Sequence, residues 1–186
     1  FYTIGYLNRE TTPKQDFEEN AVFSNEPEAF FVGCLIFLLA TMTLVAVSQH
    51  LGLLWVGIET TTLVSAPLIF FHRHHRSLEA AWKYLLICSI GIGLALLGNL
   101  FLVMAAAGGT QENISLVLGE VLAQSGNLNP LWLKAAFIFL LVGYGTKMGL
   151  APMHTWLPGA HGESPSPVSA LLSGALLNCA FLGILR

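Results

Sequence analysis

The chain has 186 residues, of which 54 % are hydrophobic and 10 % are charged, with a formal net charge of −3 and a mean hydropathy of +0.67. A soluble domain carries about a quarter charged residues, because its surface faces water. This composition excludes a soluble globular enzyme, and it excludes disorder, which needs low hydrophobicity. The absence of a basic stripe also argues against nucleic acid as a partner. Lipid is therefore the expected solvent.

The first 28 residues form a polar, acidic segment. They hold eight charged side chains, whereas the other 158 residues share eleven. The first apolar run begins only near Ala29, behind this acidic segment, so a secretory signal is not expected. Residue 1 is Phe rather than Met, and Arg186 directly follows an apolar run. These two features predict that the chain is a piece of a longer protein.

Five apolar runs follow the acidic segment. Each is close to the roughly 20 residues that a helix needs to cross about 30 Å of hydrocarbon. Lipid does not tolerate unpaired backbone groups, and the strands of a membrane barrel would be shorter and alternate in polarity. The predicted fold class is an all-α polytopic membrane protein with its transmembrane domain over residues 29–186. The expected spans are 29–49, 51–71, 79–107, 131–150 and 166–185.

The positively charged residues of the loops predict an orientation. The loop over residues 72–78 reads HRHHRSL, whereas the loop over residues 108–130 contains neither Lys nor Arg. Loops rich in Lys and Arg stay in the cytoplasm, so we expect the first loop to be cytoplasmic and the second to be external. Alternation of the spans then places residues 1–28 in the cytoplasm. Lys134 and Arg186 fall on the external side and count against this orientation.

The external loop contains apolar residues with helical spacing, which predict a short amphipathic helix at the membrane interface. These residues are Ile114, Val117, Leu118, Val121 and Leu122.

Neither the histidines nor the cysteines form a metal-binding motif. The three histidines of the 72–78 loop are interpreted as part of a basic turn. The cysteines lie inside apolar runs, without the spacing of metal ligands and without an even count for a disulfide framework. We interpret them as small buried hydrophobic residues, and no metal or cofactor is expected on this chain. They are Cys34, Cys88 and Cys179.

Glu59 is the ninth residue of the second span, about 12 Å along the helix axis and thus near the bilayer midplane. A charge at this depth costs roughly 2.5–3.5 kcal/mol on insertion scales, so it must face other helices, water or a counter-charge. The hydroxyl groups of the threonines at 60–62 and of Ser65 follow it and would help to hold water. Alternatively, Glu59 is a structural carboxyl group that is hydrogen-bonded to Thr62 or to a neighbouring helix.

Lys147 is the matching charge in the fourth span. It lies in the stretch GYGTKMGLAP over residues 143–152, whose three glycines and proline make a poor helix. We therefore expect a broken helix here, with carbonyl groups freed to serve ions or protons. His154 would lie two turns beyond Lys147 on the same face if the helix continued, and its imidazole could pass a proton to the cytoplasm. Alternatively, Lys147 extends its amine toward the interface.

Glu59 and Lys147 together suggest transport chemistry. A buried amine and a buried carboxylate stabilise each other's charge when they are close. A change in their separation or hydration would pick up protons on one side and release them on the other, without a metal or a nucleophile. Lys83, His161 and Asn178 are candidates for a secondary proton path. The alternative roles are an interfacial anchor for Lys83 and a helix–helix hydrogen bond for Asn178.

The run KMGLAPMHTWLPGAHGESPSPVSALLSG, over residues 147–174, resembles the signature of the proton-translocating antiporter-like family. That family includes the large antiporter-like subunits of respiratory complex I, the large subunits of Mrp sodium/proton antiporters and membrane subunits of group 4 hydrogenases. Two further segments, WVGIETTTLVS over residues 55–65 and SLEAAWKYL beginning at residue 77, are similar to the hydrogenase-4 and formate-hydrogenlyase branch.

The resemblance implies a fold of about fourteen transmembrane helices built from two inverted five-helix repeats, of which this chain would cover helices four to eight. It also implies that Glu59 corresponds to the family's glutamate in helix five. Lys147 corresponds to the lysine in the broken helix seven, and His154 to the histidine after the break.

Two positions depart from the family's pattern. Asn178 stands where complex I subunits carry a second lysine, and Gly159 stands where the acidic residue of the WLP-D-AH motif is usual. A lysine-to-lysine relay is therefore in doubt, and a water chain through Asn178 and Ser173 would have to serve instead.

The function that the resemblance implies is a proton-translocating subunit of a membrane-bound redox complex, of the hydrogenase-4 or NADH-quinone oxidoreductase type. The implied location is the cytoplasmic membrane of a bacterium or an archaeon. Nickel–iron and iron–sulfur centres are expected in hydrophilic partner subunits, alongside other membrane subunits. Two alternatives remain open. One is a gradient-driven subunit of an Mrp-type sodium/proton antiporter, and the other is a membrane scaffold that anchors a hydrogenase and conducts nothing.

Overall fold

The computed structural model describes residues 2–10, 14–16, 21–23, 25–107 and 116–186. The long helices in this part of the chain are α2 (Glu28–Val47), α3 (Leu51–Ile69), α4 (His75–Ala107), α6 (Pro130–Met148) and a last one composed of α8 (Ser166–Leu171), the π-helical turn η2 (Leu172–Leu176) and α9 (Leu177–Leu185). The shorter elements are α1 (Tyr2–Leu7), the strands β1 (Lys14–Asp16) and β2 (Ala21–Phe23), α5 (Leu118–Ala123), the 3-10 turn η1 (Ser125–Asn127) and α7 (Leu157–Glu163).

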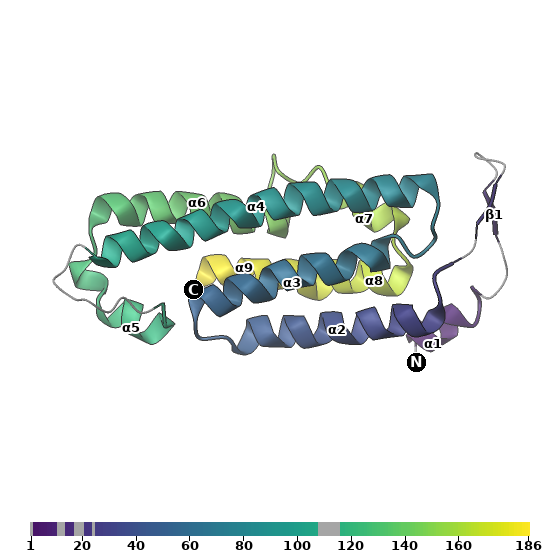
Figure 1. Cartoon of the computed structure of the whole chain (residues 1–186), viewed down its shortest axis with the longest axis horizontal. Coiled ribbons are helices and arrows are strands. Elements are labelled where there is room, and N and C mark those ends of the chain that lie inside the picture. Colours follow the sequence, from purple (N-terminus) through teal and green to yellow (C-terminus); the bar gives the residue numbers. More distant parts are fainter. Residues whose placement is uncertain (1, 11–13, 17–20, 24, 108–115) are drawn as a thin grey trace.

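The long helices run up and down beside one another (Figure 1), and five of them are long and apolar enough to cross a membrane. The turn between α3 and α4 lies at the same end as α7 and the N-terminal segment. We call this the basic end, because the turn and the start of α4 carry Arg73 and Arg76. The turn between α2 and α3 lies at the opposite end, with α5 and the C-terminus, and we call this the α5 end. The all-α membrane fold expected from the sequence is confirmed.

Helix α4 begins at His75, whereas the sequence was interpreted as a loop up to residue 78. The reason is a local cap. The Nδ1 atom of His74 accepts a hydrogen bond from the Ser77 backbone N–H, at 3.0 Å. The Ser77 hydroxyl donates in return to the His74 carbonyl group, at 2.8 Å. These bonds satisfy groups that a helix start leaves free, so the helix begins one turn earlier than its apolar run.

Helices α4 and α6 pack closely because small residues face one another. A Cβ atom at Gly143 would lie 2.5 Å from the backbone nitrogen of Ala95, and one at Gly91 would lie 2.7 Å from the Cβ of Thr146. Small residues at such an interface let two helix backbones approach in a membrane. Gly143 and Gly145 both lie inside α6. Both glycines therefore precede the break predicted near Lys147, and Gly143 allows the close packing of α6 against α4.

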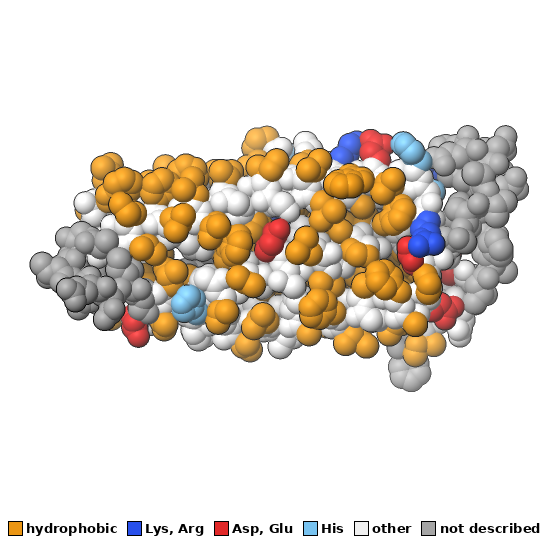
Figure 2. Space-filling model, viewed as in Figure 1, with side chains coloured by type: hydrophobic (Ala, Val, Ile, Leu, Met, Phe, Trp, Pro, Cys, Tyr) orange, Lys and Arg blue, Asp and Glu red, His pale blue; other side chains and the backbone are white. Residues whose placement is uncertain are grey.

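The outer surface of the bundle is largely apolar. Figure 2 shows hydrophobic side chains over most of the visible face, with charged side chains gathered at the basic end. Large side chains on several helices are exposed, among them Ile36, Leu63, Leu86, Ile90 and Phe137. A soluble protein does not leave a surface of this kind in water. This surface fits lipid or further membrane helices.

The N-terminal segment is tied to the turn between α3 and α4. The Nδ1 atom of His72 and the Oδ1 atom of Asn25 lie 3.1 Å apart, and the Arg73 guanidinium pairs with the Glu26 carboxylate at 2.5 Å. The hydroxyl group of Tyr6 lies 3.4 Å from the Nε2 atom of His72. Burial of the Tyr6 hydroxyl raises its pKa above the ordinary value. These contacts hold the start of α2 against the basic end.

Candidate functional site

Glu59 lies midway along α3 and is half-buried. Its Oε1 atom accepts a hydrogen bond from the Ser89 hydroxyl of α4, at 3.1 Å. Its Oε2 atom is buried and has no hydrogen-bond partner in the part of the chain that the structure describes. Figure 2 shows acidic atoms between α3 and α4, midway along the apolar face. A buried polar oxygen without a partner is rare in folded proteins and requires an explanation.

Lys147 lies in the last turn of α6, and none of its surface is exposed. Its Nζ atom donates a hydrogen bond to the hydroxyl group of Tyr84 on α4, and it lies 4.4 Å from the centre of the Tyr84 ring. Among the described residues, no carboxylate forms an ion pair with this amine. The interpretation that Lys147 extends its amine to the interface is therefore wrong, because the amine is enclosed beside Tyr84.

Tyr84 connects Lys147 to helix α3. The hydroxyl groups of Tyr84 and Ser65 share a hydrogen bond of 2.6 Å. The Ser65 hydroxyl in turn lies 2.6 Å from the carbonyl oxygen of Thr61 on its own helix. Glu59 lies on the same helix, six residues before Ser65. The buried polar groups of α3, α4 and α6 therefore form one site within an otherwise apolar bundle.

The end of α6 holds Lys147 in the middle of the bundle, because α6 stops about midway along α4 (Figure 1). Gly149 ends the helix with a left-handed backbone, at φ +80°, a conformation that glycine adopts without strain. Residues 149–156 then continue without a helix up to α7. The break that the sequence predicts near Lys147 is thus confirmed, and it begins at Gly149.

Trp156 closes this break. Its indole N–H donates a hydrogen bond to the Thr146 carbonyl group, at 2.9 Å, and its ring packs against that of Tyr84, with the ring centres 5.0 Å apart. The Leu150 N–H donates to the Gly145 carbonyl group, at 2.8 Å. These two carbonyl groups are therefore satisfied within the protein. The expectation that the break frees them to serve ions is wrong for both, and the role of Trp156 is to position Tyr84 and the end of α6.

The two histidines after the break lie apart from Lys147. His154 is exposed in the non-helical segment, so it does not share a helical face with Lys147. His161 is half-buried in α7, and its Nδ1 atom lies 2.7 Å from the Ser169 hydroxyl of α8. Burial lowers the pKa of His161 below the ordinary value for histidine. Its imidazole is therefore neutral over more of the pH range than a solvated one.

Lys83 and Asn178 also lie outside the network around Lys147. The Lys83 side chain is exposed and pairs with Glu79 one turn earlier on α4, at 2.5 Å. Asn178 is exposed on α9, where its amide donates to the Gly174 carbonyl group, at 2.8 Å. Ser173 is exposed as well, and it hydrogen-bonds to a carbonyl group of its own helix. The structure therefore links Lys147 to the hydroxyl groups of Tyr84 and Ser65. It places Glu59 beside Ser89 and leaves Lys83, Asn178 and Ser173 on outer faces.

The sequence does not assign three of these residues to the site, namely Tyr84, Ser89 and Trp156, and it names Ser65 only as a hydroxyl group that helps to hold water at Glu59. A signal for Tyr84 was present, because it follows Lys83 in a segment that already resembled a known family. A helical turn places successive residues about 100° apart, so an exposed Lys83 leaves the next side chain free to point inward.

The described residues contain no cluster of three or more His, Cys, Asp or Glu side chains that could hold a metal ion. The three cysteines are free, and Cys88 is buried near Tyr84 on the same helix. The expectation of a chain without its own cofactor stays a prediction.

Comparisons with known proteins agree on the family. The sequence model of the family described as "NADH:quinone oxidoreductase/Mrp antiporter, TM" matches residues 48–186. A relative called hydrogenase-4 component F homolog, from Methylacidiphilum infernorum, is 42 % identical over 150 residues, which are 80 % of this chain and 32 % of the relative. NADH-quinone oxidoreductase subunit N of Halorhodospira halophila is 33 % identical over 176 residues, which are 94 % of this chain and 32 % of that protein.

Two solved structures are similar in fold. A chain of respiratory complex I from Thermus thermophilus is 30 % identical, with a TM-score of 0.68, and the match covers 84 % of this chain and 33 % of that one. A chain of the archaeal membrane-bound sulfane sulfur reductase matches with a TM-score of 0.75 and 20 % identity, over 82 % of this chain and 30 % of that one. The present chain spans about a third of the length of these relatives.

Proposed function

The chain belongs to the NADH:quinone oxidoreductase/Mrp antiporter family of transmembrane proteins, and from this premise we propose that it is a proton-translocating part of a membrane-bound redox complex. The observation that carries the proposal is the enclosed amine of Lys147, whose hydrogen-bond partner is a tyrosine hydroxyl and which has no carboxylate partner among the described residues. A bare ammonium group costs several kcal/mol to bury. A fold that keeps such an amine inside a membrane bundle has a use for its changing charge.

The proposed path uses groups that are within reach of one another. Lys147 gives a proton to the hydroxyl of Tyr84, and Tyr84 gives its own proton to the hydroxyl of Ser65. Ser65 then releases its own hydroxyl proton to water. Ser65 lies on α3, the helix that also carries Glu59. Water between Ser65 and Glu59 would complete the path, and the unpaired Oε2 atom of Glu59 offers it an acceptor. Gain or loss of a proton at Glu59 then changes the stability of the charge on Lys147, and the reverse also holds.

The partners in this proposal are other membrane subunits and hydrophilic redox subunits. The relatives are named as parts of a hydrogenase-4 and of an NADH-quinone oxidoreductase, and nickel–iron and iron–sulfur centres would lie in such partner subunits. The membrane would be the cytoplasmic membrane of a bacterium or an archaeon, with the basic end toward the cytoplasm. In this proposal, His154 and His161 carry protons between the basic end and Lys147. Lys83 and Asn178 face the remaining membrane helices.

The test is affinity purification of the full-length protein in mild detergent, followed by mass spectrometry of the proteins that remain bound. A nickel–iron hydrogenase or another iron–sulfur protein among them is the expected result. The purified complex would then be placed in liposomes, where addition of its electron donor should drive proton uptake. Small membrane antiporter subunits alone, together with sodium/proton exchange that needs no electron donor, would overturn the redox proposal in favour of a gradient-driven antiporter.

Replacing Tyr84 by Phe should slow proton uptake by about tenfold, because a hydrogen bond to a charged group is worth about 1.5–3 kcal/mol. The variant keeps the ring that packs against Trp156 and removes only the hydroxyl that joins Lys147 to Ser65. The initial rate of proton uptake per electron transferred is the quantity to measure. Tyr6→Phe is the matched control, because its hydroxyl reaches only the basic end. Equal rates in the two variants would remove Tyr84 from the path.

A further inference from the structure

A cavity of about 310 Å³ lies at the α5 end of the bundle, away from the site around Lys147. Helices α4 and α6 extend beyond the ends of α2, α3 and α9, and α5 lies across the space that this leaves (Figure 1). Backbone hydrogen bonds hold α5 in place, from the Leu51 N–H to the Leu116 carbonyl group at 2.9 Å and from the Leu118 N–H to the Gln49 carbonyl group at 2.8 Å. The cavity is thus enclosed by α4, α6, α9 and α5.

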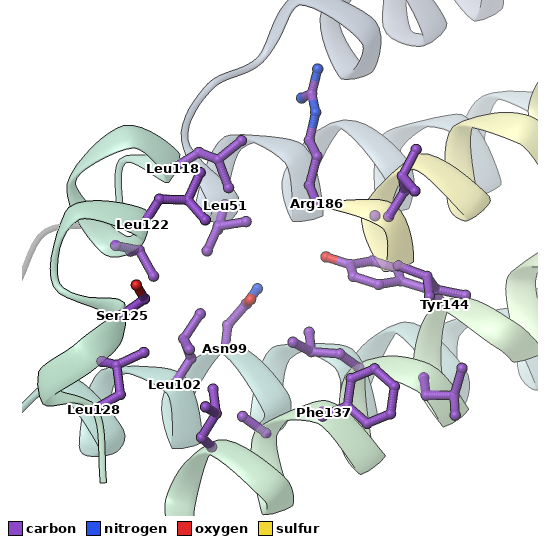
Figure 3. A pocket seen from close by; sticks show the side chains of 18 residues that line it. Leu51, Asn99, Leu102, Leu118, Leu122, Ser125, Leu128, Phe137, Tyr144 and Arg186 are labelled. Carbon is purple, nitrogen blue, oxygen red and sulfur yellow. The ribbon is translucent and has the colours of Figure 1, made fainter. Parts of the chain in front are cut away.

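The walls of the cavity are mainly apolar. Leucine side chains from five helices (α3, α4, α5, α6 and α9) line it, together with Phe137 (Figure 3). An apolar cavity of about 150 Å³ already stays free of water and takes up small hydrocarbons. The present cavity is larger and lies in a membrane protein, where the surrounding medium is hydrocarbon. Its lining therefore favours a chain of methylene groups over water.

Asn99 and Tyr144 carry polar groups that point into this cavity, and Ser125 also lines it. Asn99 is only 3 % exposed; its amide approaches the Tyr144 hydroxyl, but its Nδ2 atom makes no hydrogen bond of normal geometry among the described residues. Figure 3 shows the Asn99 amide directed into the cavity, with the hydroxyl group of Tyr144 directed into it from the other side. A buried N–H without an acceptor is costly. The cavity therefore favours an apolar ligand that carries one hydrogen-bond acceptor.

Asn99 lies near the α5 end of the bundle, at about the depth where the apolar part of α3 begins. Leu51, the first residue of α3, lines the same cavity. The carbonyl groups that join acyl chains to a phospholipid head occupy this boundary of the hydrocarbon, and they accept hydrogen bonds without donating any. We propose that the cavity binds one acyl chain of a membrane phospholipid, whose ester carbonyl group accepts a hydrogen bond from the Asn99 amide.

The lipid head would not be recognised by charge. Arg186 borders the cavity, but its guanidinium group points away from it (Figure 3) and donates to the carbonyl groups of Ala46 and Ser48 at the end of α2. The site therefore selects the acyl chain and its ester link, and it tolerates different head groups.

The first test uses the full-length protein in nanodiscs that contain a phospholipid with a photoreactive acyl chain. Illumination should label the segments of α5 and α6 that line the cavity. Leu122 is 60 % exposed and lines the mouth, so Leu122→Trp should reduce this labelling by at least about fivefold. Leu131 is 72 % exposed and lies outside the lining, so Leu131→Trp is the matched control. Labelling that is spread evenly over the apolar surface, and equal in both variants, would overturn the proposal.

The second test separates the ester carbonyl from the chain. Asn99→Leu should weaken retention of a diester phospholipid by about fivefold, the value of one ordinary hydrogen bond, and leave retention of the matching diether lipid unchanged. Native mass spectrometry of the full-length protein counts the lipids retained. Equal loss of both lipids would exclude a bond between Asn99 and the ester. Retention of an isoprenoid quinone in place of the phospholipid, or density in the cavity from another segment of the protein, would also overturn the proposal.

Discussion

Replacing Lys147 by Met should reduce redox-driven proton uptake to the background of liposomes without the complex, while electron transfer to an artificial acceptor continues. Methionine matches the length of the lysine stem but cannot hold a proton. The amine is the only group that the Tyr84 hydroxyl meets on α6, so its loss removes the charge on which the proposed path depends. The measurement is the ratio of protons taken up to electrons transferred, in liposomes that contain the purified complex.

The variant is expected to fold, because it replaces a buried charge with an apolar side chain of similar size. Such replacements are often neutral or stabilising. Lys134→Met is the matched control, since Lys134 lies on the same helix and is exposed. It should leave the ratio of protons to electrons unchanged. If Lys147→Met kept the wild-type ratio in a fully assembled complex, Lys147 would have no part in translocation, and a membrane scaffold would be the better interpretation.

The five spans could be predicted from the sequence because hydrocarbon imposes a minimum length and an apolar composition on each helix. The helices of the structure begin and end within a few residues of the predicted runs. Glu59 and Lys147 were identified for a related reason, since a charge inside an apolar span is costly and rare. Both predictions rest on the cost of placing a residue in lipid, and that cost can be judged from one segment at a time.

Tyr84 could not be found in the same way. A tyrosine in a membrane helix costs little, so insertion cost does not mark it as a partner of Lys147. Its contacts are with Ser65 and Trp156, which come from two distant parts of the chain. The glycines near Lys147 are conspicuous in the sequence, but their structural role is not. A helix with several glycines is weak in isolation, and only the structure shows that Gly143 lets α6 approach α4.

Replacing Glu59 by Gln should also abolish redox-driven proton uptake. This variant tests whether the carboxyl group acts through its charge. Glutamine has almost the same size and keeps an oxygen that can accept the hydrogen bond from Ser89. It cannot gain or lose a proton at neutral pH. A purely structural carboxyl group would tolerate this change, because its only hydrogen bond among the described residues survives.

The two roles of Glu59 therefore predict different results from one variant. If the carboxyl group carries or balances a proton, Glu59→Gln assembles normally and loses proton uptake without losing electron transfer. Glu120→Gln is the control, because Glu120 is exposed on α5, at the end of the bundle opposite the basic end. A Glu59→Gln complex with an unchanged ratio of protons to electrons would contradict the proposal for Glu59. Loss of uptake in each of the two single variants, but not in the controls, would show that translocation needs both residues.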